Sequence, residues 1–539
     1  MKLTGNIVDI SGRRTFPGEV IVENGRIAAI VETQEKLSSY ILPGFVDAHV
    51  HIESSLLVPS EFARLAVIHG TVATVSDPHE IANVLGLAGV RFMIENGKQV
   101  PFHFFFGAPS CVPATEFETA GAALTSEDTR VLLEMPEIKY LAEMMNYPGV
   151  VYGDEWVWEK LRIAQALGKP IDGHAPGLRG EALKQYAKGG ISTDHECFTR
   201  GEALEKLALG MKILIREGSA ARNFDALISL VNEHPDRCMF CSDDKHPDDL
   251  IEGHINQLVA RALRAGTDLY HALRAACINP VQHYGLETGL LRPGDPADFI
   301  VVEDLVDFRV RETYIAGQKV AAAGRSLIES VSVIPLNHFH TSPKSPAAFE
   351  IALNAARVRV ICALDGELIT REKIDEAPIR EGKGLCDPTR DLLKIAVVNR
   401  YADVPPAVAY IHGFGLKTGA IASSVGHDSH NIIAVGTDEQ TLCRAVNLVI
   451  EHSGGIAVSS PMGEYVLPLP VAGIMSDKDG HSVAQAYSRL NRLTHEMGST
   501  LRAPFMTLSF MALLVIPSLK LSDKGLFDGN NFAFVGLEV

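Results

Sequence analysis

The sequence predicts an α/β protein built around a (β/α)8 TIM-like barrel, with a small composite β-sandwich domain and an additional C-terminal α+β domain. Between residues 43 and 285, short apolar runs alternate with helical stretches, which is typical of a parallel sheet. Eight such units within about 240 residues fit a closed barrel. Two β-rich segments flank this region, and a third region with β-type alternation follows residue 330.

The length of the chain predicts more than one domain. A chain of 539 residues is too long for one compact core, so two or three domains are expected. Apolar residues make up 46% and charged residues 21%, which is typical of a globular protein. We expect a composite β domain from residues 1–42 and 286–330, the barrel over residues 43–285, and a C-terminal domain over residues 331–539.

Charge and cysteine pattern limit the expected partners and compartment. A formal net charge of −17 disfavours nucleic acid or an anionic membrane as a partner, so a small-molecule ligand is expected. No apolar run reaches the length of about 18 residues that a transmembrane helix needs, and the first residues lack the apolar core of a signal peptide. Eight cysteines without regular spacing fit a reducing compartment, so we expect a cytoplasmic protein.

The two flanking segments share the pattern of short strands joined by tight turns. In "GEVIVENGRIAAIV", Asn24 and Gly25 stand between two apolar alternations, which is a strong hairpin signal. A similar alternation returns in residues 294–324. We therefore expect both segments to pair into one small β domain.

Each candidate barrel strand is a short apolar run that ends in polar residues. In such barrels the carboxyl ends of the strands carry the chemistry. The first run, "GFVDAHVHIESS" at residues 44–55, places two histidines and two carboxylates on one face, because strand side chains alternate. The eight runs lie in "ILPGFVDAHVH", "GTVATVSDPHE", "FHFFFGAPSC", "IKYLAEMMN", "KPIDGHAP", "GISTDHE", "MKILIREGS" and "RCMFCSDDK".

Metal-binding side chains recur at these strand ends. A single buried histidine is more often a hydrogen-bonded core residue than a ligand, but here the same end of several strands carries one. A metal site explains that recurrence better than chance does. The polar residues at the strand ends, of which the histidines and carboxylates can bind metal, are His49 and His51 after the first strand, Asp77, His79 and Glu80 after the second, Glu143 after the fourth, His174 after the fifth, His195 after the sixth, Arg216 and Glu217 after the seventh, and Asp243 after the eighth.

Six of these residues form the expected ligand set. Imidazole nitrogen and carboxylate oxygen, without thiolate, suit divalent zinc, iron, manganese or cobalt. Six ligands exceed what one ion with an open position needs, so two divalent ions are expected. Glu143 is the natural bridge, because a carboxylate can offer one oxygen to each ion. The set consists of His49, His51, Glu143, His174, His195 and Asp243.

Several motifs carry a resemblance to a known family. The start "DAHVH", the strands of His174 and His195 and the final "SDD" resemble the amidohydrolase superfamily of barrel enzymes. A closer resemblance, which extends into the third region, is to bacterial adenine deaminases. It rests on "GFVDAHVHIESS", "SDPHEIANVLG", "APSCVPATEFE", "LAEMMNYPGV", "DGHAPGL" and "HDSHNIIAVG".

One departure from the wider superfamily favours the narrower resemblance. Many binuclear members bridge their ions with a carboxylated lysine at the end of the fourth strand. Here Glu143 stands at that end and Lys139 lies four residues earlier, which resembles the adenine deaminase type. The rival bridge is Glu155 in "YGDEWVW", which should lie on a loop past the strand end.

The resemblance also implies how the ligands divide between the ions. Manganese and iron are the first candidates for the metal, and zinc is a third. Asp244 is the alternative to Asp243, and Asp47 is expected to orient a ligand histidine. One ion would be held by His49, His51 and Asp243, the other by His174 and His195, with Glu143 shared.

The activity implied by the resemblance is hydrolytic deamination, in which a metal-bridged hydroxide attacks C6 of adenine and releases hypoxanthine and ammonia, in purine salvage or catabolism. Asp243 would take the hydroxide proton and pass it to the departing amine. Glu80 is a second catalytic candidate, although a carboxylate that caps the following helix is an equal alternative. His79, Ser110 and Cys111 are expected to bind the substrate, from their positions after the second and third strands.

The "GHDSHN" segment allows two interpretations. His427, Asp428 and His430 could form a lid or accessory site over the barrel mouth, or the segment could be a polar turn held by local backbone bonds. The rival activities are a cyclic-amide hydrolase of hydantoinase or dihydroorotase type, and a catalytically inactive scaffold of the same shape. A homo-oligomer is expected.

Overall fold

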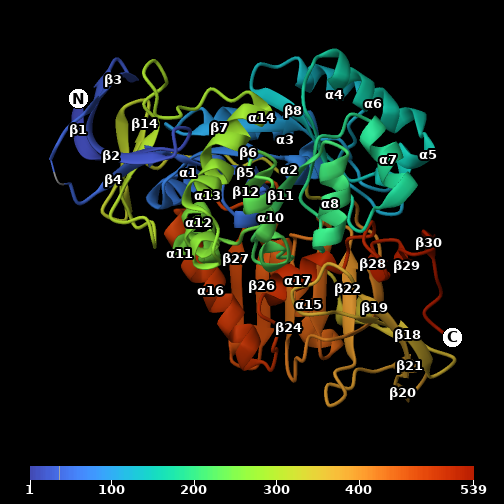
Figure 1. Ribbon diagram of the computed structural model, residues 1–539. Helices are drawn as coiled ribbons and strands as arrows, with labels where there is room; N and C mark the ends of the chain where they lie inside the picture. The colour runs from blue at the N-terminus through green and yellow to red at the C-terminus, as the bar shows by residue number, and fades with distance from the viewer. Residues whose placement is uncertain (36) are drawn as a thin grey trace.

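The structure, a computed structural model, describes residues 1–35 and 37–539. Figure 1 shows three parts: a blue and yellow-green sheet that carries the N-terminus, a central barrel with its surrounding helices, and an orange to red C-terminal region beneath the barrel. Among the described residues, no helix is both long enough and apolar enough to span a membrane.

The small sheet is built from both ends of the barrel segment. β2 and β3 form the expected hairpin, with Asn24 at φ 49° and Gly25 at φ 74°, the left-handed pair that a type I′ turn requires. β4 joins the two halves, because it pairs parallel with β1 and antiparallel with β13. The sheet order is β16-β15-β14-β13-β4-β1-β2-β3. The bounds are β1 Lys2–Asp9, β2 Arg14–Glu23, β3 Arg26–Glu32, β4 Tyr40–Pro43, β13 Phe299–Val302, β14 Val310–Ile315, β15 Gln318–Ala322 and β16 Arg325–Ser326.

Parallel strands of the described chain form the barrel, and each of the eight predicted runs contains one of them. β5 to β9 make one parallel set and β10 to β12 another. Isolated parallel bridges, Ile171 to Ile191 and Val50 to Asp243, connect the sets and close the ring. The strands are β5 Phe45–Val50, β6 Thr71–Ser76, β7 His103–Ala108, β8 Ile138–Met144, β9 Ile171–Gly173, β10 Thr193–Asp194, β11 Lys212–Arg216 and β12 Cys238–Cys241.

Helices follow the strands and cover the outside of the barrel (Figure 1). α4 illustrates how the sequence starts them: Thr125 and Asp128 exchange side-chain and backbone bonds in a capping box. The helices are α1 Pro59–Ala66, α2 His79–Leu85, α3 Leu87–Gly97, α4 Ser126–Leu133, α5 Tyr147–Tyr152, α6 Glu155–Ala166, α7 Gly180–Lys188, α8 Arg200–Ala208, α9 Phe224–Leu227, α10 Ser229–Glu233, α11 Pro247–Glu252, α12 Ile255–Arg264, α13 Leu269–Leu273 and α14 Asn279–Tyr284.

The C-terminal region is centred on a second eight-stranded sheet, in the order β19-β18-β23-β22-β25-β24-β26-β27. Its central strands β22 and β25 are buried along their whole length, which explains why "LKIAVV" and "IIAVG" are apolar except for Lys394, whose ammonium pairs with Glu439. A small sheet of β28 to β30 lies near the C-terminus (Figure 1). The bounds are β17 Ile351–Ala352, β18 Arg357–Cys362, β19 Arg371–Glu376, β20 Ile379–Arg380, β21 Lys383–Gly384, β22 Leu393–Val398, β23 Ala407–His412, β24 Ala420–Ser423, β25 Ile432–Gly436, α15 Glu439–Glu451, β26 Gly455–Ser460, β27 Gly463–Pro468, α16 Gly480–Glu496, α17 Pro504–Phe510, β28 Leu519–Ser522, β29 Gly525–Asp528 and β30 Ala533–Phe534.

The C-terminal region docks directly on the barrel. Helix α16 packs against α1 and α11, and the Ser476 N–H donates to the Leu56 carbonyl at 2.8 Å. Arg64 adds an ion pair with Asp479 at 2.9 Å. Barrel and C-terminal side chains belong to one continuous buried apolar cluster. Because apolar burial is the main stabilising force, this shared core fixes C-terminal loops over the carboxyl ends of the barrel strands.

Candidate active site

Two histidines at the end of β5 begin the site. The Nε2 atoms of His49 and His51 are 3.2 Å apart, and Asp243 Oδ1 lies 3.3 Å from the first and 3.4 Å from the second. His51 Nδ1 faces the Asp77 carbonyl at 3.2 Å. Because a carbonyl only accepts, the neutral ring carries its proton on Nδ1, which leaves Nε2 free to bind a cation.

Asp243 is held by residues of the two strands beside β12, which are β5 and β11. It follows β12 with φ 55°, a left-handed conformation that aspartate tolerates better than most residues, and its N–H donates to the His49 carbonyl at 2.9 Å. Arg216, at the end of β11, donates to Asp243 Oδ2 at 2.6 Å and to both oxygens of Glu196. Burial alone would raise the pKa of Asp243, but the Arg216 guanidinium and the neighbouring imidazoles hold it well below its usual range.

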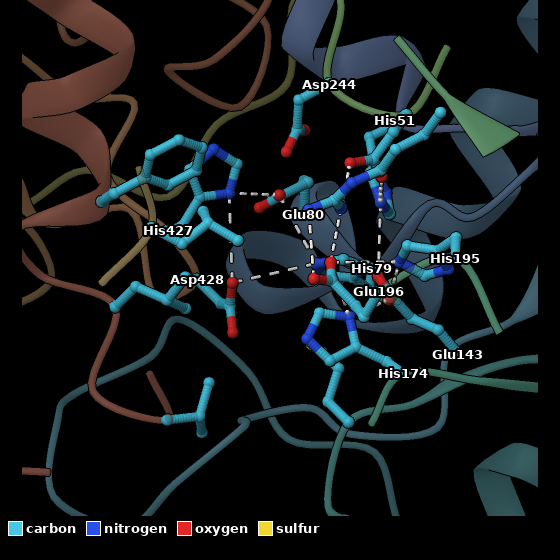
Figure 2. Close-up of a pocket in the computed structure, with 17 residues that line it drawn as sticks. His51, His79, Glu80, Glu143, His174, His195, Glu196, Asp244, His427 and Asp428 are labelled. Carbon is cyan, nitrogen blue, oxygen red and sulfur yellow. Dashed lines mark hydrogen bonds and ion pairs between the residues drawn. The ribbon is translucent and has the colours of Figure 1, made fainter. Parts of the chain in front are cut away.

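Glu143, at the end of β8, connects three strands. Its Oε2 lies 2.6 Å from His174 Nδ1 and 3.1 Å from His195 Nε2, and its Oε1 lies 3.3 Å from His51 Nε2. Burial raises the pKa of this carboxyl, but His174 and His195 outweigh burial and hold the pKa well below its usual value. Each oxygen of Glu143 therefore faces a different part of the histidine cluster (Figure 2).

The cluster fits divalent cations. Its converging atoms are imidazole nitrogens and carboxylate oxygens, the donors that zinc, iron and manganese accept. Two imidazole nitrogens 3.2 Å apart, with the carboxylates of Asp243 and Glu143 beside them, form a buried group of ligand atoms that a cation would stabilise. Within three overlapping groups the possible ligand atoms lie within 4.8 Å of one another: His49, His195 and Asp243; Glu143, His174 and His195; and His51, Asp77, His79 and Glu143.

A second buried group lies across the pocket from Glu143 (Figure 2). Glu80 Oε1 accepts from His427 Nδ1 at 2.5 Å, and its Oε2 pairs with His430 Nε2 at 2.5 Å. His79 Nε2 lies 3.4 Å from Glu80 and 3.9 Å from Asp428. Burial lowers the pKa of His427, but Glu80 outweighs burial and the net pKa is about 9; burial raises the pKa of Asp428 to about 6.

These contacts distinguish the two interpretations of the "GHDSHN" segment and of Glu80. The segment connects β24 to β25 and is buried, and it brings His427 and Asp428 into the same pocket as the barrel histidines. It is therefore a wall of the site as well as a turn. Glu80 lies in the first turn of α2, but its carboxylate oxygens pair with His427 and His430.

The pocket between the two groups is small and nearly buried, with a volume of about 30 Å³. Its polar wall carries the residues labelled in Figure 2, including Glu196, which the sequence analysis did not single out although it follows His195 at the end of the sixth strand. Its apolar wall could not be predicted, because such residues have the same pattern whether they line a pocket or a core. That wall consists of Met145, Leu368, Phe510, Leu513 and Val515.

Ser110 and Cys111 lie beside this pocket and line a neighbouring hollow. The Ser110 hydroxyl donates to the backbone carbonyl of Glu143 at 2.5 Å, so it supports the strand end that carries the central carboxylate. Burial raises the pKa of the Cys111 thiol. Substrate binding by this pair stays a prediction.

Three further expectations can be compared with the geometry. Glu155 begins α6, has a side chain 83% exposed and pairs with Arg162, so the rival bridge is wrong. Asp244 accepts from Ser54 at 2.5 Å, while Asp243 occupies the position beside His49 and His51.

Asp47 does not orient a ligand ring, contrary to expectation. Its carboxylate accepts from the Ser242 N–H at 3.0 Å and the Ser242 hydroxyl, and pairs with His254 Nε2 at 2.8 Å; its contact with His49 is to the backbone N–H at 3.4 Å. The reason is that β12 lies beside β5 in the closed barrel, so the side chain reaches the neighbouring strand. Asp47 thereby holds the strand end that carries Asp243.

Comparisons with known proteins show the family of the chain. The model of the amidohydrolase family matches residues 40–320, and that of the adenine deaminase C-terminal domain matches residues 367–533. A protein of Sulfurovum sp. (strain NBC37-1) that is named adenine deaminase is 59% identical to this chain over 99% of both chains. Another of that name, from Salinibacter ruber, is 56% identical over 99% of this chain and 98% of its own length. A third, from Methanosarcina acetivorans, is 52% identical over 99% of both chains. The chain therefore belongs to the adenine deaminase family of the amidohydrolases.

Proposed function

We propose that this chain catalyses the hydrolysis of adenine to hypoxanthine and ammonia, a reaction of purine salvage or catabolism. The observation that carries the proposal is that both matched segments build one pocket. The barrel segment supplies the histidine cluster around Glu143, and the C-terminal segment supplies His427, Asp428 and Phe510. Relatives that match over nearly the full chain are named adenine deaminases.

Two divalent ions would complete the site. We assign manganese or iron as the metals, with zinc as a further candidate, because the donors are nitrogen and oxygen. When bound, such ions act as Lewis acids and lower the pKa of water toward neutrality. The proposed ligands are His49, His51 and Asp243 for one ion and His174 and His195 for the other, with Glu143 shared.

Asp243 is the proposed base. Its Oδ2 is held by Arg216 at 2.6 Å, so Oδ1 is the oxygen that faces the histidines and the pocket. Because its pKa is held well below its usual range, the carboxylate is ionised near neutral pH and can accept a proton from the attacking water. The C6–O bond forms first. Asp243 then passes that proton to the exocyclic amine, the C6–N bond breaks and ammonia leaves, while the second proton of the attacking water returns to the group that protonates N1, which leaves hypoxanthine.

The Glu80 group is the proposed source of the proton for ring atom N1. Attack at C6 places negative charge on the ring, and a proton at N1 neutralises it. His79 and His427 both line the pocket and both contact Glu80, which keeps the pKa of His427 near 9 and the ring protonated at neutral pH. Glu80 thus holds a positively charged donor at the pocket wall, and Asp428 lies beside both imidazoles.

The apolar wall of the pocket would contact the faces of the purine ring and exclude water. Phe510 lies against His427, with ring centroids 5.2 Å apart, and with Leu368 and Leu513 it forms part of the apolar wall of the pocket. A planar purine fits between an aromatic wall and a polar wall, because the ring faces are apolar and the ring edge is polar. Excluding bulk water there also strengthens each electrostatic contact.

The test is reconstitution of the full chain separately with iron, manganese and zinc, followed by assays of ammonia release from adenine, adenosine and hydantoin. We expect ammonia from adenine, and turnover of hydantoin at background level. Hydantoin opening without ammonia release from adenine would instead assign the cyclic-amide hydrolase. Metal content is measured on the same samples, because a preparation without metal would give no ammonia for a trivial reason.

A further inference from the structure

A large hollow adjoins the active-site pocket. Its volume is about 850 Å³, within the range of about 300–1,000 Å³ that small-molecule sites occupy. It lies between the segments that follow β7 and β8, the helices α5 and α6, and the C-terminal segment near Val515 and Phe532. Its lining is rich in aromatic rings, which are Phe117, Tyr147, Tyr152, Trp156 and Phe532.

Two residues line both cavities. Met145 and Val515 belong to the apolar wall of the active-site pocket and also to the wall of the large hollow. The active-site pocket, at about 30 Å³, has room for two or three water molecules by the usual measure of about 10–15 Å³ each. Adenine has ten ring and amine heavy atoms, so part of the wall has to move before the ring can enter. Met145 and Val515 are the part of that wall with open space behind it.

Trp156 lines this hollow, and its indole ring is held in a position where a planar ligand could stack on it. The ammonium of Lys160 lies 3.9 Å from the centroid of the indole ring and donates to the carbonyls of Ser110 and Leu124, at 2.8 and 3.0 Å. The backbone N–H of Trp156 donates to the side chain of Asp154, which caps the start of α6. One face of the indole is therefore held by a buried cation, and the residue is still 43% exposed.

We propose that this hollow is a vestibule that binds the planar purine by stacking on Trp156 and delivers it to the active site past Met145 and Val515. The inference rests on the proposed function for the identity of the ring. Purine bases stack on aromatic side chains whatever their substituents, so adenine and hypoxanthine both bind there. Asp154 and Asn146 also line the hollow, and their carboxylate and amide could meet the polar edge of a purine.

The first test separates substrate capture from chemistry. In the reconstituted full chain, Trp156→Ala is expected to raise the KM for adenine about tenfold and to leave kcat unchanged, because stacking on the way in does not touch the reacting atoms. The matched control is Leu167→Ala, at the end of the same helix, since Leu167 is 40% exposed and lies outside the hollow. Leu167→Ala should leave both KM and kcat unchanged.

A second variant tests the passage itself. Val515→Trp places a large ring between the two cavities and is expected to lower kcat/KM for adenine at least tenfold with metal content unchanged. The matched control is Val131→Trp in α4, because Val131 is 36% exposed and lines neither cavity; it should leave kcat/KM unchanged. Equal kcat/KM for Val515→Trp and the unmodified chain would overturn the proposed route.

Fluorescence provides a readout that does not depend on turnover. The chain contains two tryptophans, Trp156 and Trp158, so Trp158→Phe leaves Trp156 as the single reporter. Titration of this reconstituted variant with hypoxanthine should quench the Trp156 emission in a saturable manner. The variant Trp156→Ala, which keeps Trp158, should show no saturable quenching.

The outcomes distinguish the vestibule from the deaminase assignment. The vestibule is wrong if Trp156→Ala releases ammonia from adenine with an unchanged KM and hypoxanthine does not quench Trp156 in the Trp158→Phe variant. That result leaves the deaminase assignment intact. Quenching by hypoxanthine without any ammonia release from a metal-loaded chain overturns the deaminase and keeps a purine site. If Trp156→Ala instead breaks an oligomer into monomers at unchanged KM, the hollow is an interface between copies and the vestibule is wrong.

Discussion

Arg216 offers the sharpest test of how this site is held together. The guanidinium is buried and pairs with Asp243 at 2.6 Å and with Glu196 through two nitrogens. Arg216→Met keeps the length and apolar stem of the side chain but removes the charge. Two buried carboxylates then lose their shared cation, and a buried charge without a partner is strongly destabilising.

The expected magnitude follows from burial. Breaking a buried ion pair from one side costs about 3–5 kcal/mol, which for a domain of this size corresponds to a fall in Tm of about 6–20 °C. The matched control is Arg264→Met, because Arg264 pairs with Asp307 at 3.2 Å and its side chain is 60% exposed. An exposed pair contributes about 0–1 kcal/mol, so this control should shift Tm by less than about 4 °C.

Thermal unfolding of both variants is measured with divalent metal bound and after chelation. Bound cations near Asp243 replace part of the missing positive charge, so the Arg216→Met effect should be smaller in the metal-loaded protein. Adding Glu196→Gln to Arg216→Met removes one of the two unpaired carboxylates and should recover part of the lost Tm. Equal Tm shifts for Arg216→Met and Arg264→Met would refute the electrostatic account of the site.

Three shorter predictions concern the metal centre, the proton donor and a buried lysine. Glu143→Gln should lower bound metal to one ion or fewer per chain, as measured by metal analysis, and reduce kcat about 100-fold in the ammonia assay. Glu155→Gln, which changes an exposed side chain, should alter neither the metal content nor kcat. His427→Gln should lower kcat about 100-fold at unchanged metal content, and an unchanged kcat would exclude a proton-transfer role for the Glu80 group. Burial lowers the pKa of Lys520 to about 7 from its unfolded value of about 10.5. Between these pH values the unfolded chain binds more protons than the folded chain, so Tm should rise as the pH rises from about 7 to 9. Lys520→Met should flatten that rise.

Much of the barrel was predictable because its signal is local. Each predicted strand run contains an observed strand, and Asn24 and Gly25 form the predicted turn. Parallel strands in a closed barrel point the same way, so residues that end different strands meet at one edge. That rule brought His49, Glu143 and His195 together before any contact was known, and the structure places them in one cluster.

Other parts of the site could not be read from the local pattern. The pairing of Glu80 with His427 and His430 joins segments more than 300 residues apart, and only the docking of the C-terminal sheet on the barrel brings them together. The contacts of Asp47 with Ser242 and His254 depend in the same way on which strand lies next to β5.

The amino-acid order alone decided the repeating strand–helix alternation, the ligand types and the end of the barrel at which they gather, because apolar periodicity and strand direction are properties of short segments. Tertiary structure decided which carboxylate faces which imidazole, and which apolar residues, such as Phe510 and Val515, became the wall of a pocket. The physical reason is that an apolar side chain gains the same free energy from burial in a core as beside a cavity, so its sequence pattern is the same in both places.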